Sequence, residues 1–268
     1  MESEFVSVAP VRPVAPYIGG KRNLADRIIG LIEQVPHRTY AEPFVGMGGV
    51  FLRRRQRPRA EVINDYSRDV ANLFRVVQRH YTPFTEMLRY QLASRARFQE
   101  LADTPPDGLT DMERAARFLY LQRLAFAGRV AGRTFGVDPS SPARFDVTKL
   151  IPFLDELHVR LAGVMIECLP YLDFLGRYDR PGTLFYLDPP YWGCEDDYGK
   201  ELFSQDDFSR LATRLKTLKG HFIMSLNDVE PVRDLFGGFN ILPVKTTYTA
   251  AKGKATPARE VIIANLCL

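Results

Sequence analysis

The residues best suited to chemistry stand together at the end of one apolar run. Leu184–Leu187 are apolar, and Asp188, Pro189, Pro190 and Tyr191 follow them. The Asp188 carboxylate and the Pro189 carbonyl can accept both hydrogens of an exocyclic amine, and the prolines add no competing N–H donor. Such acceptors stabilise positive charge that develops on an attacking nitrogen, and an aromatic ring can stack on a base. Taken alone, the tetrapeptide also fits a strand that ends in a proline turn.

A second group of residues is typical of an adenosine site. Gly46, Gly48 and Gly49 lie between a predicted strand and a predicted helix, where glycine lets a ligand approach the backbone. Phe51 occupies the position of the third glycine in the dinucleotide fingerprint, which argues against a nicotinamide dehydrogenase. Asp65 ends the next predicted strand, roughly 20 residues on, where a carboxylate can accept both hydroxyls of a ribose. The alternative for Asp65 is a helix N-cap.

Two basic segments are candidates for contact with nucleic acid. Residues 53–59 hold five arginines and are as compatible with a solvated helix end as with a binding role. Residues 114–133 contain no acid; their arginines and aromatic residues are Arg114, Arg117, Arg123, Arg129, Arg133, Phe118, Tyr120 and Phe126. This mixture suits phosphate contact and wedging between bases. The alternative is an amphipathic helix, and we expect Phe118, Leu119 and Leu121 in the core.

Composition excludes several other classes. The three cysteines of the 268-residue chain have no CxxC spacing, so we predict no disulfide framework and no metal site. None of the four histidines accompanies a nucleophile motif. The N-terminus does not resemble a signal peptide, and no apolar run reaches the length of a membrane span. We therefore expect a soluble, cytoplasmic protein without a membrane partner, and the net charge of +4 slightly favours a polyanionic ligand.

These residues require an α/β scaffold to position them. Strand–helix successions at 39–56 and 60–80 predict parallel strands with right-handed crossovers. Further helices are expected at 23–35, 149–161 and 205–218, and strands within 182–192, 220–228, 239–248 and 259–266. Residues 81–146 contain no apolar strand run. We predict a catalytic domain of residues 1–80 and 147–268, a smaller, mainly helical insertion at 81–146, and an extended arm at 1–16.

In this order, the motifs resemble the D12 class of N6-adenine-specific DNA methyltransferases, the group that is similar to the DNA adenine methylases. The matching segments are PYIGGK (16–21), EPFVGMGGVFL (42–52), IND (63–65), YLDF (171–174), DPPY (188–191) and FIMSLND (222–228). The tetrapeptide alone is modest support, whereas the tetrapeptide with the glycine loop and the ribose acid is specific.

The resemblance implies a Rossmann-like class I methyltransferase sheet with helices on both faces, and it makes the insertion a target-recognition domain. It implies catalytic roles for Asp188, Pro189, Pro190 and Tyr191. It implies that S-adenosyl-L-methionine contacts Tyr17, Lys21, Glu42, Phe44, Gly46, Gly48, Gly49, Asp65, Asp173, Phe174 and Asp188. It implies that DNA contacts Lys21, Arg123, Phe126, Arg129, Arg133 and Tyr191. The GATC methylases have a tyrosine and Asn-Gly where this chain has Phe126 and Ala127-Gly128, so GATC specificity is not implied.

The expected reaction is methyl transfer from S-adenosylmethionine to N6 of an adenine flipped out of double-stranded DNA. The residues themselves specify only an exocyclic amine, so N4 of cytosine in DNA and N6 of adenine in RNA stay open. A non-catalytic DNA-binding protein on the same core is a further alternative. We expect a bacterial or phage-encoded protein. The recognition sequence, a companion restriction endonuclease and the oligomeric state do not follow from the sequence.

Overall fold

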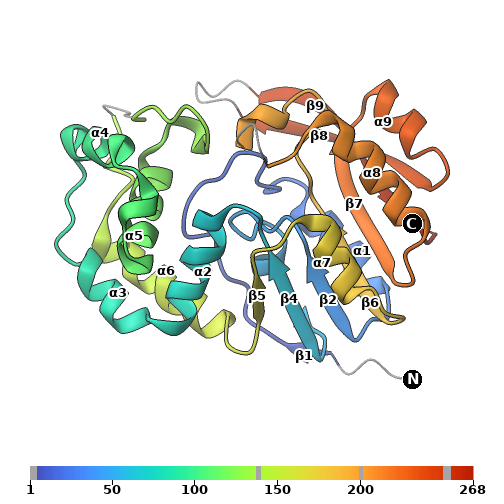
Figure 1. The fold of residues 1–268 in the computed structure, drawn as a ribbon, viewed down its shortest axis with the longest axis horizontal. Helices are drawn as coiled ribbons and strands as arrows, with labels where there is room; N and C mark the ends of the chain where they lie inside the picture. The colour runs from blue at the N-terminus through green and yellow to red at the C-terminus, as the bar shows by residue number, and fades with distance from the viewer. Residues whose placement is uncertain (1–4, 137–139, 199–201, 250–254, 268) are drawn as a thin grey trace.

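A seven-stranded sheet forms the centre of the protein (Figure 1). The computed structural model describes residues 5–136, 140–198, 202–249 and 255–267. Along the sheet the strands are β5 (Met165–Glu167), β4 (Ala60–Asn64), β2 (Thr39–Glu42), β6 (Thr183–Leu187), β7 (His221–Asn227), β9 (Ala255–Ala264) and β8 (Asn240–Thr249). The five strands from β5 to β7 are parallel, and β9 runs antiparallel to both of its neighbours.

Both faces of the sheet are buried, as the run of apolar residues in β6 requires. Leu184 and Tyr186 belong to one hydrophobic cluster and Phe185 and Leu187 to the other, because successive side chains of a strand point to opposite faces. The first cluster is covered by α1 (Ala25–Gln34) and α2 (Arg68–Arg79). The second is covered by α7 (Tyr171–Tyr178), α8 (Gln205–Lys216) and α9 (Glu230–Leu235). The Rossmann-like α/β prediction is confirmed.

The segment predicted as an insertion is helical in its described residues. It contains α3 (Tyr81–Leu88), α4 (Arg95–Asp103), η2 (Pro106–Gly108), α5 (Asp111–Leu124) and η3 (Phe126–Gly128), and α6 (Val147–Arg160) follows it. These helices gather beside the β5 edge of the sheet (Figure 1). Phe118, Leu119 and Leu121 are buried as expected, in the cluster that also holds α1 and α2. The insertion is thus packed onto the main core, and its identity as a target-recognition domain stays a prediction.

The N-terminal arm is extended, as predicted, from residue 5 on, while residues 1–4 of the prediction lie outside the described residues. Backbone hydrogen bonds to residues 52–57 hold it in place. β1 (Val6–Ser7) pairs antiparallel with β3 (Gln56–Arg57), and the Val11 N–H donates to the Leu52 carbonyl at 2.8 Å. We call residues 5–18 the strap. The helix expected before residue 56 is wrong, since only the short η1 (Phe51–Arg53) forms. The chain turns back instead to form β3 and to carry Arg54 inward.

Arg54 is buried, so the solvated helix end is the wrong interpretation for this member of the arginine run. Arg54 and Arg160 share the carboxylate of Glu61, with N–O distances of 2.7–2.8 Å. Their guanidinium groups lie 3.8 Å from the ring centre of Tyr40 and 4.0 Å from that of Phe51, respectively. Stacking and pairing compensate two charges that would otherwise be costly to bury.

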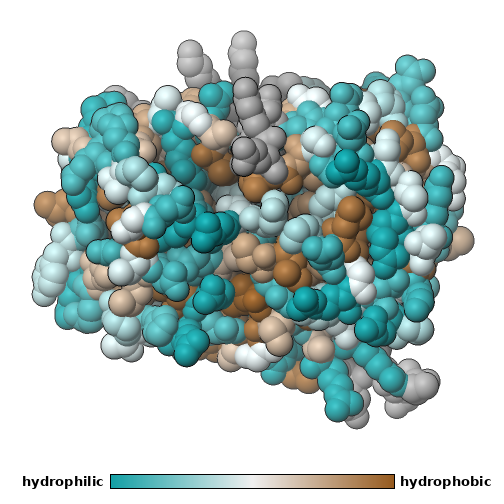
Figure 2. Space-filling model, viewed as in Figure 1, coloured by the Kyte–Doolittle hydropathy of each residue, from teal (hydrophilic) through white to brown (hydrophobic). Residues whose placement is uncertain are grey.

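On the surface, hydrophilic side chains cover the helices on both sides of the face seen in Figure 2, and hydrophobic side chains gather between them. No helix in the described ranges is long and apolar enough to cross a membrane.

Candidate active site

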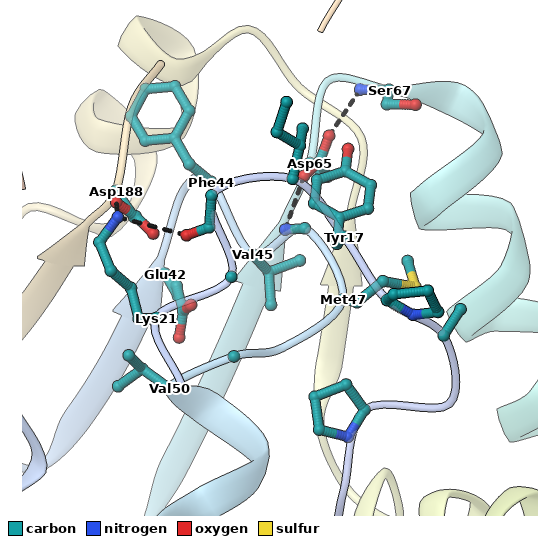
Figure 3. A pocket seen from close by; sticks show the side chains of 18 of the residues that line it. Tyr17, Lys21, Glu42, Phe44, Val45, Met47, Val50, Asp65, Ser67 and Asp188 are labelled. Carbon is teal, nitrogen blue, oxygen red and sulfur yellow. Dashed lines mark hydrogen bonds and ion pairs between the residues drawn. The ribbon is translucent and has the colours of Figure 1, made fainter. Parts of the chain in front are cut away.

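A cavity of about 1170 Å³ opens where β2, β4 and β6 end. After β2 the chain continues into β4 on one side of β2, whereas β6 pairs with β2 on its other side. The strand order therefore reverses at this point of the sheet, and α/β proteins bind ligands at such topological switch points. Figure 3 shows Lys21 and Asp188 on one side of the cavity and Tyr17 and Asp65 on the other. Ten of the predicted residues line it: Tyr17, Lys21, Glu42, Phe44, Gly46, Gly49, Asp65, Arg123, Asp188 and Pro190.

Asp188 is the chemical centre of one end of the cavity. The Lys21 ammonium lies 2.6 Å from its Oδ1, and the Ser225 hydroxyl donates to the same oxygen at 3.1 Å. Burial raises the pKa of Asp188 above its ordinary value, while Lys21 and Ser225 act in the opposite direction. Lys21 also lies 4.4 Å from the ring centre of Tyr191. The predicted cation therefore contacts both the predicted carboxylate and the predicted aromatic ring.

Two residues of β7 hold the loop of residues 188–192, and the sequence analysis did not include either as a site residue. The Ser225 hydroxyl also shares a 2.8 Å hydrogen bond with the Tyr186 hydroxyl. The Asn227 amide accepts from the Trp192 N–H and donates to the Trp192 carbonyl, both at 3.0 Å. The sequence indicated these two residues only as a serine and an asparagine in a mostly apolar predicted strand.

Asp65 is held by the glycine loop at the other end of the cavity. Its carboxylate accepts from the Gly46 N–H and from the Ser67 N–H, each at 2.9 Å. Burial raises the pKa of Asp65 to about 6, although both hydrogen bonds lower it. Neither bond reaches the first turn of α2, so Asp65 does not act as its N-cap. Gly46 has a φ of +49°, and a Cβ there would come within 3.0 Å of the Tyr17 ring.

Gly48 does not line the cavity. Its φ is +75°, and a Cβ would lie 2.7 Å from the Leu52 side chain, so this glycine is needed for the turn itself.

Three aromatic rings form an apolar wall beside Asp65. The ring centres of Phe44, Tyr171 and Phe203 are 5.5–5.9 Å apart. Asn64 ties this wall to the glycine loop, because its amide bonds the carbonyls of Pro43 and Leu169 and accepts from the Leu169 N–H.

Asp173 and Phe174 lie away from this wall. Phe174 is fully buried beneath α7 against Phe185 and Tyr178, and Asp173 is exposed on the outer side of that helix. Asp173 follows Tyr171 by two positions and so points to another side of α7, whereas Phe174 lies one turn after Tyr171 on the same side and is buried in the core. Tyr171 itself lines the cavity. The structure therefore places Tyr171, rather than its two predicted neighbours, at the site.

Glu42 lies at the end of β2, on the floor of the cavity. It accepts a 2.6 Å hydrogen bond from the Tyr40 hydroxyl. Burial, with a further contribution from the charge of Asp188, raises the pKa of Glu42 to about 8. Its carboxyl group is consequently mostly protonated at neutral pH, which limits the negative charge beside Asp188.

Gln122 of α5 joins the strap to the predicted DNA-binding segment. Its buried amide donates to the carbonyls of Pro16 and Gly128 at 2.8 and 2.7 Å, and the Gly128 carbonyl also accepts from the Ile18 N–H. Gly128 has a φ of +68°, and a Cβ would lie 3.0 Å from the Tyr17 nitrogen. The cavity wall and the turn at residues 126–128 are therefore one connected unit.

The four predicted DNA-binding residues of this segment divide into two pairs. Arg123 bonds the carbonyls of Val14 and Arg144, and Arg133 bonds the Gln122 side chain. Phe126 and Arg129 are exposed, Phe126 by 43%. Arg123 and Arg133 thus have structural contacts, and Phe126 and Arg129 are accessible. Among the described residues, no group of histidine, cysteine or acidic side chains is arranged to hold a metal ion.

Comparisons with known proteins agree with this arrangement. A family model described as D12 class N6 adenine-specific DNA methyltransferase matches residues 17–250. The type II methyltransferase M1.LlaDCHI of Lactococcus lactis subsp. cremoris is 27% identical, over 95% of this chain and 95% of its own. The type II methyltransferase M.CviBI of Paramecium bursaria Chlorella virus NC1A is 22% identical, over 85% and 88%. The Retron Ec67 DNA adenine methylase of Escherichia coli is 24% identical, over 82% and 80%.

Proposed function

Because this chain belongs to the D12 class of N6 adenine-specific DNA methyltransferases, we propose that it methylates N6 of an adenine flipped out of duplex DNA, with S-adenosylmethionine as donor. The observation that carries the proposal is the shared cavity of Asp188 and Asp65. One carboxylate adjoins a proline carbonyl and an aromatic ring, and the other is presented by a glycine loop.

The residues at the Asp65 end fit an adenosine group. Each Asp65 oxygen accepts one backbone N–H and keeps a lone pair for a ribose hydroxyl. The wall of Phe44, Tyr171 and Phe203 offers an apolar surface to a flat base. Gly46 has no Cβ, so the Tyr17 ring can pack closely against the glycine loop. S-adenosylmethionine, when bound, supplies an electrophilic methyl group.

The residues at the Asp188 end fit an amine that must become a nucleophile. The lone pair of an adenine N6 is delocalised into the ring, so acceptors for its two hydrogens favour a tetrahedral nitrogen. Asp188 and the Pro189 carbonyl are these acceptors, and both stabilise the positive charge that develops on N6. The proton leaves after the nitrogen has become cationic. The proximity of Lys21 favours the ionised form of Asp188.

Extrusion of the base from the helix costs a few kcal/mol, which aromatic contacts offset in part. Tyr191 adjoins Asp188 and can stack on the extruded base, a contribution of about 1–3 kcal/mol. The exposed Phe126 can fill the space that the base leaves in the duplex. Arg129, which follows in the same turn and is also exposed, can contact DNA.

The test is a product analysis. Duplex DNA is incubated with the protein and S-adenosylmethionine labelled in its methyl group, and the nucleosides are separated. The proposal expects label in N6-methyldeoxyadenosine. Label in N4-methyldeoxycytidine would show that the same chemistry methylates the exocyclic amine of cytosine instead. An RNA arm tests the remaining alternative, and absence of any labelled nucleoside, with the cofactor bound, would favour a non-catalytic DNA-binding protein.

Two relatives are named as type II methyltransferases, which supports the proposal that this protein functions together with a restriction endonuclease. An endonuclease that cuts unmodified DNA and does not cut DNA treated with this protein would establish that pairing.

A further inference from the structure

Three arginines line the cavity from the side of the strap. Arg12 belongs to the strap, Arg22 precedes α1, and Arg53 lies in η1. Arg12 and Arg22 are exposed, and Arg53 is half-buried. None of them belonged to the predicted site, and Arg53 opens the arginine run whose purpose the sequence left undecided.

The backbone brings these three residues together from separate parts of the chain. The Val11 N–H donates to the Leu52 carbonyl, which sets Arg12 of the strap beside Arg53 of η1. The glycine loop joins Arg22 to them, because a Cβ on Gly49 would lie 3.3 Å from the Lys21 nitrogen and 3.8 Å from Arg53 Nη1. Arg53 also donates to the Gly49 carbonyl, which directs its side chain along the cavity wall.

Their positive charge is poorly compensated. In the part of the chain that the structure describes, none of the three forms an ion pair, although Asp26 lines the cavity beside them. Burial lowers the pKa of Arg53, repulsion from Arg22 lowers it further, and the negative charge of Asp26 acts in the opposite direction. Neighbouring guanidinium groups that form no ion pair repel one another, and a bound anion would relieve that repulsion.

We propose that Arg12, Arg22 and Arg53 bind backbone phosphates of the DNA strand whose base enters the cavity. This proposal rests on the proposed function and adds the position of the strand. A base that reaches Asp188 keeps its phosphodiester links, which stay at the rim of the cavity. Arg22 follows Lys21 directly, and Lys21 contacts Asp188. The rim is where the exposed arginines lie, and the guanidinium fork matches a phosphate.

The strand is then held from two sides. The arginines of the strap side take the phosphates next to the extruded base, and the turn with Phe126 and Arg129 faces the remaining duplex from α5. The strap then contributes to DNA binding, because it holds Arg12 beside η1.

The test measures DNA affinity without turnover. DNA dissociation constants are determined between 50 and 200 mM salt with S-adenosylhomocysteine present, for wild type and the Arg12→Gln/Arg22→Gln/Arg53→Gln variant. Each lost phosphate contact lowers the slope of log K against log salt by about 0.9. The expected result is a slope reduced by about 2–3 and affinity weakened about 30-fold or more at low salt.

A matched control removes the same charge elsewhere. Arg177, Arg180 and Arg210 are exposed on or beside α7 and α8, on the opposite face of the sheet. Their triple glutamine variant is expected to keep the wild-type slope within about 0.5, which separates a local site from net charge. The single Arg22→Gln variant, at an exposed position, repeats the measurement with the smallest risk to folding and is expected to lower the slope by about 0.9.

Two results would overturn the proposal. One is an unchanged salt slope in the cavity variants. The other is a cofactor affinity weakened tenfold or more with DNA affinity intact, which would assign the arginines to the cofactor carboxylate. A wild-type protein that binds DNA with the expected slope, yet transfers no methyl group to adenine, would contradict the proposed function and leave the phosphate site standing.

Discussion

The ammonium of Lys21 lies 2.6 Å from the carboxylate of Asp188 inside the cavity. This pair sets the charge at the proposed reaction centre, because burial favours the protonated acid and Lys21 favours the anion. A protonated Asp188 would offer a donor where the mechanism needs an acceptor.

Replacement of Lys21 by methionine should therefore raise the pKa of Asp188 further. We expect the acidic limb of the profile of kcat/KM against pH to move to higher pH, and activity at pH 7 to fall about 100-fold. The Lys21→Arg variant keeps the charge and should keep the limb closer to that of wild type. An acidic limb that stays in place in Lys21→Met would contradict this role.

Ser225 should act on the rate through its bond to Asp188. In Ser225→Ala, kcat is expected to fall about tenfold, while cofactor affinity stays within about twofold. The variant also leaves the buried Tyr186 hydroxyl without its serine partner, which costs about 1–3 kcal/mol of stability. Tyr186→Phe in the Ser225→Ala background should restore stability and leave kcat low. If Tyr186→Phe restored both stability and kcat, the role of Ser225 would be structural only.

The affinity for S-adenosylmethionine should depend on the ionisation of Asp65. Its pKa of about 6 means that the carboxylate accepts ribose hydroxyls above that pH and is protonated below it. We expect the dissociation constant to rise by up to about tenfold per pH unit below pH 6. The Asp65→Asn variant should bind about 100-fold more weakly at pH 7.5 and show no such dependence. Calorimetric titration between pH 5 and 8 measures both, and a pH-dependent variant would contradict the assignment.

Gly128 and Gly132 form a natural comparison. Both have positive φ, +68° and +58°, but only a Cβ on Gly128 meets the strap, at 3.0 Å from Tyr17. Alanine at either position should cost about 1–2 kcal/mol of backbone strain. Gly128→Ala should in addition displace the strap and weaken cofactor binding at least tenfold, whereas Gly132→Ala should leave the affinity within about twofold. Equal affinities in the two variants would show that the strap does not depend on this contact.

The shared carboxylate of Glu61 should dominate stability. Glu61→Gln leaves two buried guanidinium groups without their anion and should lower the free energy of unfolding by about 3–5 kcal/mol. Glu100→Gln removes the exposed partner of Arg97 and should change it by less than about 1 kcal/mol. Denaturant titration compares the two, and similar losses would contradict the importance of the buried cluster.

Sequence reasoning predicted the elements that follow strong periodicity. β6, β7 and α8 lie where the apolar patterns predicted them. Each pattern reflects the burial of one face of the helix or of both faces of the strand, so the spacing of apolar residues identifies the element. The same reasoning failed after the glycine loop, where a helix was expected and only η1 forms. There Arg54 turns inward to pair with Glu61, and the second partner of Glu61, Arg160, lies about a hundred positions later and has no local signal.

The site was predictable where a motif is local and unpredictable where contacts are distant. Asp65 and Asp188 precede turns whose residue types show a site. Ser225 and Gln122 act through partners on other elements, and their positions follow only from the packed structure. The resemblance also directed attention to Phe174, which the packing of α7 buries, and away from Tyr171, one turn earlier in the same helix.

The most direct test of the central claim compares wild type with Asp188→Asn in a single turnover on duplex DNA, with the cofactor affinity of both proteins measured in parallel. We predict N6-methyldeoxyadenosine as the product of wild type. The variant should bind the cofactor within about threefold of wild type and transfer methyl at least 100-fold more slowly. A variant that still forms N6-methyldeoxyadenosine at the wild-type rate would contradict the assignment of the reaction to Asp188.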